Sequence, residues 1–191
     1  IINKGDDKIA RGNKLIHNSI KRENYQREMA KKLLEDAHDE DIILINDIDE
    51  IPNLDEVNFN IINNKIIIFK QKTFYYKFNL MYVNLIWHGS KACKKKNFLS
   101  PQWLRNVKHK KYSIWRLDLI FSKRKFTDIY YVKNGGWHFT NIKSPEDLEK
   151  KFQNFLHHQD FEASGLKLEN IKQMVRNNKI LYDLGVDRRN N

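Results

Sequence analysis

The chain lacks the residues and patterns that mark several common protein classes. It has a single cysteine, Cys93, which excludes an intrachain disulfide and a metal cluster held by thiolates. No apolar run approaches the roughly eighteen residues that span a bilayer, and no signal-peptide pattern opens the chain. A Gly-rich phosphate loop, a Ser-His-Asp order and a Cys-x-x-Cys pair are also missing. We therefore expect a soluble protein without these familiar catalytic motifs.

Positive charge and aromatic side chains are what the sequence does contain. The 191 residues are 40% hydrophobic and 12% aromatic, which suits one globular domain with a sizeable core. The net charge of +11 favours a polyanionic partner, which could be a nucleic acid, an acidic membrane surface or a nucleotide diphosphate. Charge alone does not choose among these three. Because the first residue is Ile rather than Met, we expect a fragment or a processed form.

The stretch from Asp41 to Pro52 organises the prediction. Its apolar run, Ile42–Ile45, is typical of a strand buried on both faces of a mostly parallel sheet. Asp47 and Asp49 follow the run two residues apart, so their carboxylates share one side if the extended conformation persists. Such a pair at the end of a strand suits Mg²⁺ or Mn²⁺ shared with substrate phosphates. The alternative is an ordinary acidic pair in a surface turn.

Periodicity and capping residues predict the other elements. We expect one α/β domain over residues 1–191, with a poorly defined leader at 1–18 and a frayed tail at 187–191. The expected helices cover 19–37, 100–107 and 168–176, and one more starts at Pro145; the expected strands cover 42–45, 66–69, 80–87 and 129–132, with a basic loop at 91–97.

Two further clusters could carry chemistry. In the first, Gly135 and Gly136 allow a tight turn that presents Trp137 as a platform for a sugar and His138 as a hydrogen-bonding group or ligand. A hairpin with a core tryptophan is the alternative.

The second cluster is the segment 157–160, His-His-Gln-Asp, at the end of the helix that starts at Pro145. His158 could supply a further metal ligand, and Asp160 could supply a base. The alternative is a pair of histidines that cap the C-terminus of a helix, where the helix dipole favours them.

Together these motifs resemble glycosyltransferase family 17, whose members include the enzyme that adds bisecting GlcNAc. The resemblance covers roughly residues 20 to 185 and rests on the segments 22–27, 46–52, 74–79, 136–140 and 158–160 together with Arg105. It implies a GT-A-like (Rossmann-like) fold with a mixed sheet flanked by helices, a UDP-sugar donor, Mn²⁺ (or Mg²⁺) and transfer with inversion. Only 46 residues precede Asp47. The first part of a GT-A fold is therefore either short or missing here.

The expected activity is transfer of a sugar, most simply GlcNAc, from UDP to a glycan hydroxyl. Asp47 would contact the ribose or the metal, and Asp49 would bind the metal that bridges both phosphates. Arg27 and Arg105 are candidates to neutralise the diphosphate.

The attacking hydroxyl also needs a base, and two carboxylates are candidates, Glu50 and Asp160. The resemblance places His158 beside the metal. Trp137 and His138 are the expected sugar contacts.

The competing hypothesis is a non-catalytic module that binds nucleic acid or another polyanion through its lysine clusters and tryptophans. The transferase hypothesis instead expects a UDP-sugar and a glycan as partners, no nucleic acid, and peripheral membrane association through the basic surface. It places the protein in the cytoplasm or at a membrane, or in the Golgi lumen if an N-terminal anchor precedes this sequence.

Overall fold

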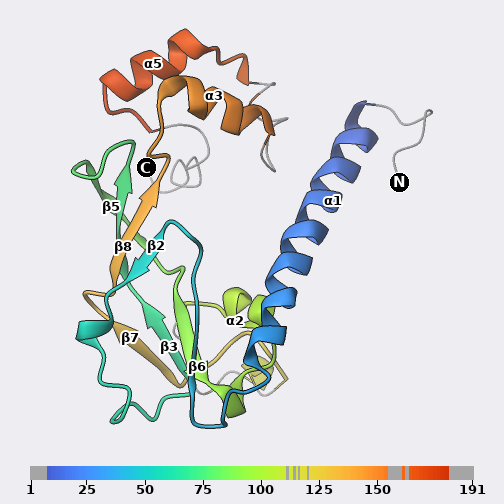
Figure 1. The fold of residues 1–191 in the computed structure, drawn as a ribbon, viewed down its shortest axis with the longest axis vertical. Helices are drawn as coiled ribbons and strands as arrows, with labels where there is room; N and C mark the ends of the chain where they lie inside the picture. The colour runs from blue at the N-terminus through green and yellow to red at the C-terminus, as the bar shows by residue number, and fades with distance from the viewer. Residues whose placement is uncertain are drawn as a thin grey trace. The chain divides into compact units, whose positions relative to one another are not determined.

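The computed structural model describes residues 8–110, 112–113, 115, 117–119, 121–154, 161 and 164–180. Helices flank two β-sheets, which confirms the predicted α/β class (Figure 1). The chain forms two compact units. One comprises Ile1–Glu23, Tyr75–Lys77 and Asn141–Asn191, and the other comprises Asn24–Phe74 and Phe78–Thr140. We call the second, which contains the strand that precedes the acidic pair, the sheet unit, and the first the helical unit.

The first sheet of the sheet unit is mixed and has the strand order β1-β6-β3-β7. β3 pairs in parallel with β7 and antiparallel with β6, and β6 pairs antiparallel with β1. The bounds are Ile42–Ile45 for β1, Ile66–Phe69 for β3, Lys91–Lys94 for β6 and Ile129–Val132 for β7.

β3 is the strand buried on both faces. All four of its residues are buried, because Ile67 and Phe69 enter one apolar cluster while Ile66 and Ile68 enter another. Burying one such side chain is worth about 1.5–3 kcal/mol, so β3 holds the two clusters of the sheet together. The sequence predicts this strand at its observed bounds.

β1 differs from its prediction as a strand buried on both faces of a mostly parallel sheet. It lies at the edge of the sheet, antiparallel to β6, and Ile43 is its only fully buried residue. Ile42 and Leu44 pack half-buried against a core cluster, which is enough to require an apolar run. The chain then turns, since the Glu50 amide donates to the Asp47 carbonyl at 3.0 Å. The acidic pair therefore lies in a turn rather than on an extended strand.

The second sheet has the order β2-β8-β4-β5, and Figure 1 shows β2 beside β8. β2 pairs antiparallel with β8, and β4 pairs antiparallel with β5 with a shift of register between Lys72 and Thr73. The bounds are Glu50–Pro52 for β2, Gln71–Tyr75 for β4, Met81–Trp87 for β5 and Gly136–Thr140 for β8.

Two strands of the sheet unit, β6 and β8, were not predicted from the sequence. The expected basic loop at 91–97 contains β6, because Lys91 and Cys93 are buried despite the lysine-rich composition. The chain does turn at 133–134 after β7, close to the turn predicted at the paired glycines, but β8 then begins at Gly136, where the prediction named no strand. Gly136 has a φ of +111° and approaches β2 so closely that a Cβ would lie 2.0 Å from the Ile51 carbonyl oxygen. This glycine therefore allows close strand pairing directly after the turn.

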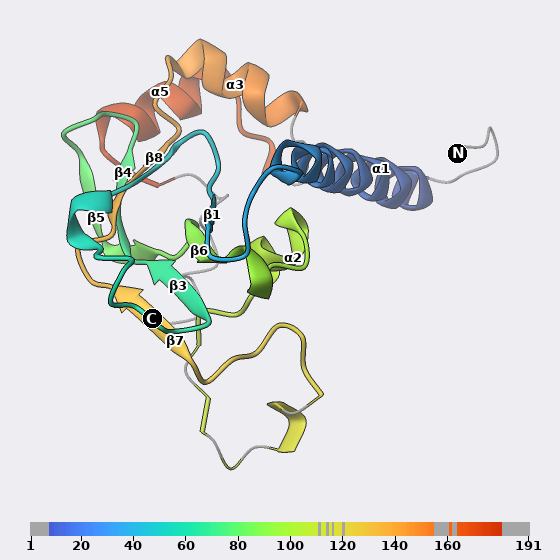
Figure 2. The ribbon, with the colours of Figure 1, turned by 60° about the horizontal axis from the view of Figure 1, so that its bottom comes forward.

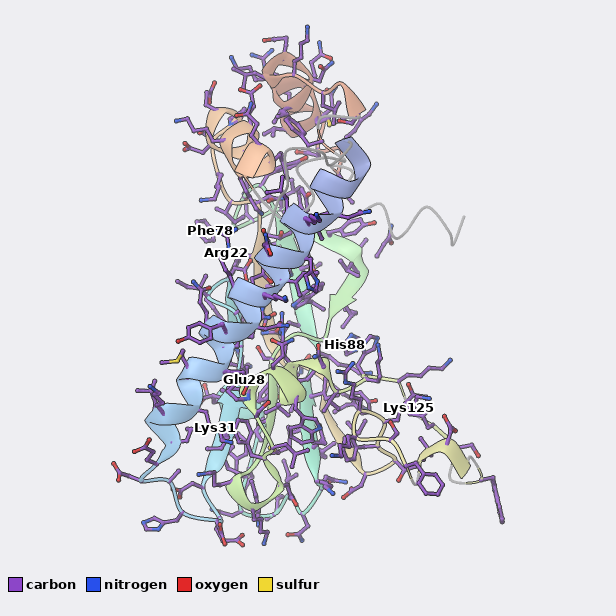
Figure 3. The ribbon with its side chains drawn as sticks, turned by 90° about the vertical axis from the view of Figure 1, so that its right-hand side faces the viewer. Arg22, Glu28, Lys31, Phe78, His88 and Lys125 are labelled. Carbon is purple, nitrogen blue, oxygen red and sulfur yellow. The ribbon has the colours of Figure 1, made fainter. Side chains whose placement is uncertain are left out.

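Helix α1, Lys8–Met29, begins well before the predicted residue 19, so the expected leader at 1–18 is wrong from Lys8 onward. A 3₁₀ turn, η1, continues it over Ala30–Leu34. Figure 3 labels Glu28 on α1, close to the end of the helix. Its carboxylate accepts hydrogen bonds from the Ser100 hydroxyl (2.7 Å) and the backbone N–H of Gln102 (3.1 Å). These bonds fix the last turn of α1 to the start of the next helix.

That next helix, α2, covers Pro101–Asn106 and lies beside β6 in Figure 2. Ser100 caps it by accepting from the Trp103 amide, and Pro101 occupies its first turn, as the sequence predicts. Its position matters because it carries Arg105. Short 3₁₀ helices cover Leu54–Glu56 (η2), Lys95–Asn97 (η3) and Leu117–Leu119 (η4).

In the helical unit, α3 (Pro145–Asn154) packs against α5 (Leu168–Arg176). Leu148 and Phe152 lie four residues apart on one face of α3, and both are fully buried together with Ile171 of α5. The predicted frayed tail at 187–191 lies outside the described residues, and so does the segment that contains His158 and Asp160. None of the described helices has the length and apolar character needed to cross a membrane.

Candidate functional site

A buried carboxylate, Glu50, lies at the centre of a polar cluster in the sheet unit. Its residue is only 2% exposed. Arg105 binds it with both terminal nitrogens, at 3.1 Å to Oε2 and 2.8 Å to Oε1. The Trp87 indole donates to Oε1 at 2.7 Å, and the Ser90 hydroxyl and the Asp47 amide donate to Oε2 at 3.1 and 3.2 Å.

This environment determines what Glu50 can do. A buried carboxylate is tolerated only when a cation and hydrogen bonds offset its desolvation, and here a two-pronged guanidinium and three further donors do so. Both oxygens already accept from these groups. Glu50 is therefore suited to positioning Arg105 and Trp87, and less suited to taking a proton from a substrate hydroxyl.

The structure brings the three predicted donor-binding residues together. Asp47 forms ion pairs with Arg105 at 2.5 Å and with Arg27 at 3.4 Å. Arg27 also donates to the Gln102 side chain at 3.0 Å, which ties α1 to α2 at this point. The Asp47 side chain is 36% exposed, so the cluster reaches the surface. It presents two guanidinium groups and one carboxylate beside the turn after β1.

Asp49 lies on the other side of that turn, next to His138 of β8. The closest approach is 3.7 Å, between a carboxylate oxygen and Nε2 of the imidazole. The Asp49 side chain is 44% exposed, whereas the imidazole is buried and stacks on Trp87, with ring centroids 4.4 Å apart. Among the described residues no group hydrogen-bonds the buried Nδ1 of His138.

The two predicted sugar contacts lie on opposite faces of β8. His138 points to the buried face together with Glu50, its cross-strand neighbour on β2. Trp137 points to the exposed face opposite Ile51, and 39% of its surface remains accessible. Only Trp137 can therefore act as an open stacking platform.

Trp87, Gly89 and Ser90 are site residues that the sequence-based prediction did not assign to the transferase site; it placed Trp87 only at the end of the expected strand 80–87. Gly89 is essential to the geometry. A Cβ at that position would lie 1.8 Å from Oε1 of Glu50 and 2.2 Å from Nε1 of Trp87. The Trp-His-Gly-Ser order was visible, but nothing local in it points to a glutamate 37 residues earlier.

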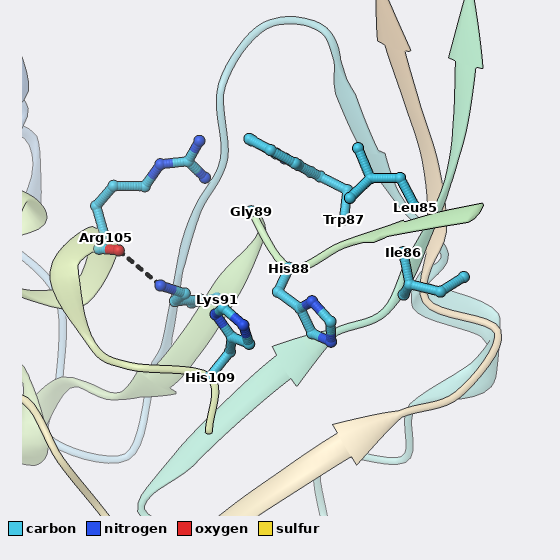
Figure 4. Close-up of a pocket in the computed structure, with 8 residues that line it drawn as sticks. All are labelled: Leu85, Ile86, Trp87, His88, Gly89, Lys91, Arg105 and His109. Carbon is cyan, nitrogen blue, oxygen red and sulfur yellow. Dashed lines mark hydrogen bonds between the residues drawn. The ribbon is translucent and has the colours of Figure 1, made fainter. Parts of the chain in front are cut away.

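A pocket of about 340 Å³ opens beside this cluster (Figure 4). Lys91 lies on its wall, and its ammonium donates to the Arg105 and Val107 carbonyls, both at 2.6 Å. Burial, reinforced by the nearby Arg105 charge, lowers the Lys91 pKa to about 8. His88 stacks on His109 with ring centroids 4.5 Å apart. Burial lowers the pKa of both imidazoles, that of His88 to about 4.

The acidic residues fit a metal only in part. Within the described ranges no three His, Cys, Asp or Glu side chains gather in a way that could hold an ion. Asp47 already pairs with two arginines, so Asp49 is the carboxylate better placed for a cation. One or two carboxylates are the usual protein contribution when substrate phosphates complete the coordination of Mg²⁺.

Comparison with known proteins finds no matching family model, no matching curated protein and no matching solved structure. The function therefore has to be inferred from the motifs and from the geometry of the site.

Proposed function

We propose that this chain is a metal-dependent, inverting glycosyltransferase with a GT-A-like fold that moves a sugar, GlcNAc in the simplest case, from UDP to a glycan hydroxyl. One observation carries the proposal. Asp47 and Asp49 lie on the turn that follows β1, and Arg27 and Arg105 converge on the first of them. Carboxylates for a hard cation and guanidinium groups for phosphates are thus available at one place.

In this proposal the donor lies against the arginine cluster. Arg27 and Arg105 contact the diphosphate, while Asp47 holds both guanidinium groups in place and can accept from a ribose hydroxyl. Asp49 and the diphosphate would hold Mn²⁺ or Mg²⁺, which when bound supplies a Lewis acid for the departing UDP. Glu50 acts as a positioning residue, because it fixes Arg105 from the buried side.

The acceptor sugar would use Trp137, whose exposed ring can stack on the apolar face of a pyranose. In the reaction the acceptor oxygen attacks the anomeric carbon, the bond to UDP breaks, and a carboxylate takes the hydroxyl proton. Since both Glu50 oxygens already accept hydrogen bonds, Asp160 is the proposed base, with His158 as its neighbour near the metal. Both residues lie outside the described part of the chain.

The polyanion-binding alternative is less well supported by the contacts of the basic side chains. Lys94 and Lys96 pair with Glu40, whose pKa their hydrogen bonds lower to about 2. Lys125 pairs with Asp118. The Trp87 ring stacks on His138, so one of its faces is already covered. The acidic partners of the lysines compete with the phosphates that a nucleic acid would offer.

A thermal-shift series with nucleotide sugars tests the proposal. UDP-GlcNAc with Mn²⁺ should stabilise the protein by about 2.7 kcal/mol at one hundred times its Kd, and UDP-GlcNAc with EDTA should not. A binding assay with single-stranded nucleic acid, titrated with salt, is the counterpart. Strong salt-dependent binding that ignores Mn²⁺ and UDP would favour the polyanion-binding alternative.

A further inference from the structure

The pocket shown in Figure 4 has two chemically distinct ends. Lys91, His109 and the Arg105 backbone lie at one end, and the side chains of Leu85 and Ile86 lie at the other, with His88 between them. The described residues that line the pocket include no carboxylate. A cationic end and an apolar end in one pocket are the features expected of a site for an amphiphilic anion.

The groups at the cationic end have capacity left for a ligand. A lysine ammonium has three N–H donors, and Lys91 gives two of them to the Arg105 and Val107 carbonyls. The third remains for an oxyanion. The His109 imidazole, which stacks on His88, adds an N–H group on the same wall. The His88 ring already donates to the Ile86 backbone, so it contributes its ring face and not a donor. Lys91 lies on β6 and His109 follows it in the chain, so the fold brings the two donors together.

The electrostatics of the pocket point the same way. Lys91 is only 5% exposed, and its neighbours Arg105 and Lys108 are also cationic. Glu50 favours the charged form of Lys91, but Arg105 already pairs with that carboxylate. A buried ammonium without its own counter-ion is destabilised, and a bound anion would relieve this.

We propose that this pocket binds a phosphate ester, with the phosphate at Lys91 and His109 and the organic part against Leu85 and Ile86. Phosphate is favoured over carboxylate because donors from two separate side chains converge there, and a phosphate offers three oxygens to accept from them. The site needs no metal. Its occupation would also bear on the arginine cluster, since Arg105 contributes its carbonyl to Lys91 and its guanidinium to Asp47 and Glu50.

Isothermal titration calorimetry in EDTA tests the proposal, with inorganic phosphate, phenyl phosphate and benzoate as probes. Phenyl phosphate should bind about ten-fold more tightly than inorganic phosphate, because its ring adds apolar burial worth about 1.4 kcal/mol. Equal or tighter binding of benzoate would overturn the assignment to phosphate. Binding that appears only with Mn²⁺ would overturn the site itself.

Variants locate the binding. His109→Phe keeps the stacked shape and removes the donors, so it should weaken phenyl phosphate about ten-fold. His38→Phe makes the same change in the turn before β1 and should change affinity less than two-fold. Lys91→Met should abolish binding, and its melting curve shows whether it folds. If it does not fold, His109→Phe decides, and unchanged binding in that variant places the anion elsewhere.

The test of the phosphate-ester site and the test of the proposed transferase activity can fail independently. Phosphate-ester binding in EDTA by a protein that neither binds UDP with Mn²⁺ nor transfers sugar would support the pocket and refute the transferase. The opposite pattern would refute the pocket alone.

Discussion

At the residue scale, the site depends on a close approach that only glycine allows. Gly89→Ala would place a methyl group against the Glu50 carboxylate and the Trp87 indole. We expect a loss of about 1–3 kcal/mol of unfolding free energy, as for other overpacked cores, together with loss of the Trp87–Glu50 hydrogen bond. Urea denaturation and tryptophan fluorescence measure the two effects.

Gly165→Ala is the matched control for that variant. Its φ of +65° strains any side chain, but no atom lies within 4 Å of the added Cβ, so only the backbone term of about 1 kcal/mol remains. If the two variants were equally stable, the tight contact at Gly89 would not be a feature of the folded protein.

The second prediction at this scale concerns Asp49. Asp49→Asn keeps the shape of the side chain and removes the charge that a hard cation requires. We expect it to abolish Mn²⁺-dependent UDP binding and sugar transfer without lowering the melting temperature, since the side chain is 44% exposed. Asp55→Asn, in the exposed turn after β2, is the control and should bind UDP normally. Near-normal metal-dependent binding in Asp49→Asn would place the metal elsewhere.

Two tryptophans should separate function from stability. Trp137→Ala removes an exposed ring and should lower turnover with little change in melting temperature. Trp87→Ala removes a ring that stacks on His138 and bonds Glu50, so it should cost about 3–5 kcal/mol of stability. Steady-state kinetics and thermal melts on both variants make the comparison. A large stability loss in Trp137→Ala would assign its ring to the core.

At the scale of elements, shortening a side chain should destabilise the protein much more in β3 than in β5. Ile68→Ala, in the centre of β3, should cost about 2–5 kcal/mol, because the side chain is fully buried. Val83→Ala, on the edge strand β5, should stay within about 0.5 kcal/mol, because that side chain is 69% exposed. Chemical denaturation of the two variants measures the difference, and similar losses would contradict the observed strand order.

Elements with strong local signals are the ones that the sequence predicts well. α2 begins at a serine cap followed by proline, and β3 is a short run of four apolar residues. β6 was missed because two lysines bound it, and the burial of Lys91 depends on carbonyls 14 and 16 residues further along the chain. β8 was missed because glycine is favoured in turns, whereas here it permits close pairing with β2.

The candidate site was predictable only in part, for a similar reason. The acidic pair and its two arginines follow from local motifs and from charge, and the structure brings Asp47, Arg27 and Arg105 together. The position of Glu50 does not follow from its neighbours in sequence. Its partners Trp87 and Arg105 are 37 and 55 residues away, and only the folded sheets bring them to one carboxylate.

At the scale of the whole molecule, His88 in the pocket makes the stability of the fold depend on pH. The pKa of His88 is about 4 in the folded protein, below its ordinary value of 6.5, because of burial and of the facing His109, Lys70 and Lys91. The unfolded chain therefore binds more protons between these two values, so stability is full above pH 6.5 and is lost as the pH falls toward 4. The melting temperature should decrease over this range, and less steeply in His88→Phe. Equal slopes in the two proteins would exclude His88 as the cause.

The single thiol, Cys93, can be used to measure how often the first sheet opens. Cys93 lies in β6 between two paired strands, it is 1% exposed, and burial raises its pKa to about 12. A thiol reagent can therefore reach it only after the first sheet separates, and no other cysteine contributes to the signal. The rate of alkylation in the native protein then measures how often that sheet opens. Since the strand begins with Lys91, a phosphate ester bound in the pocket should slow the reaction.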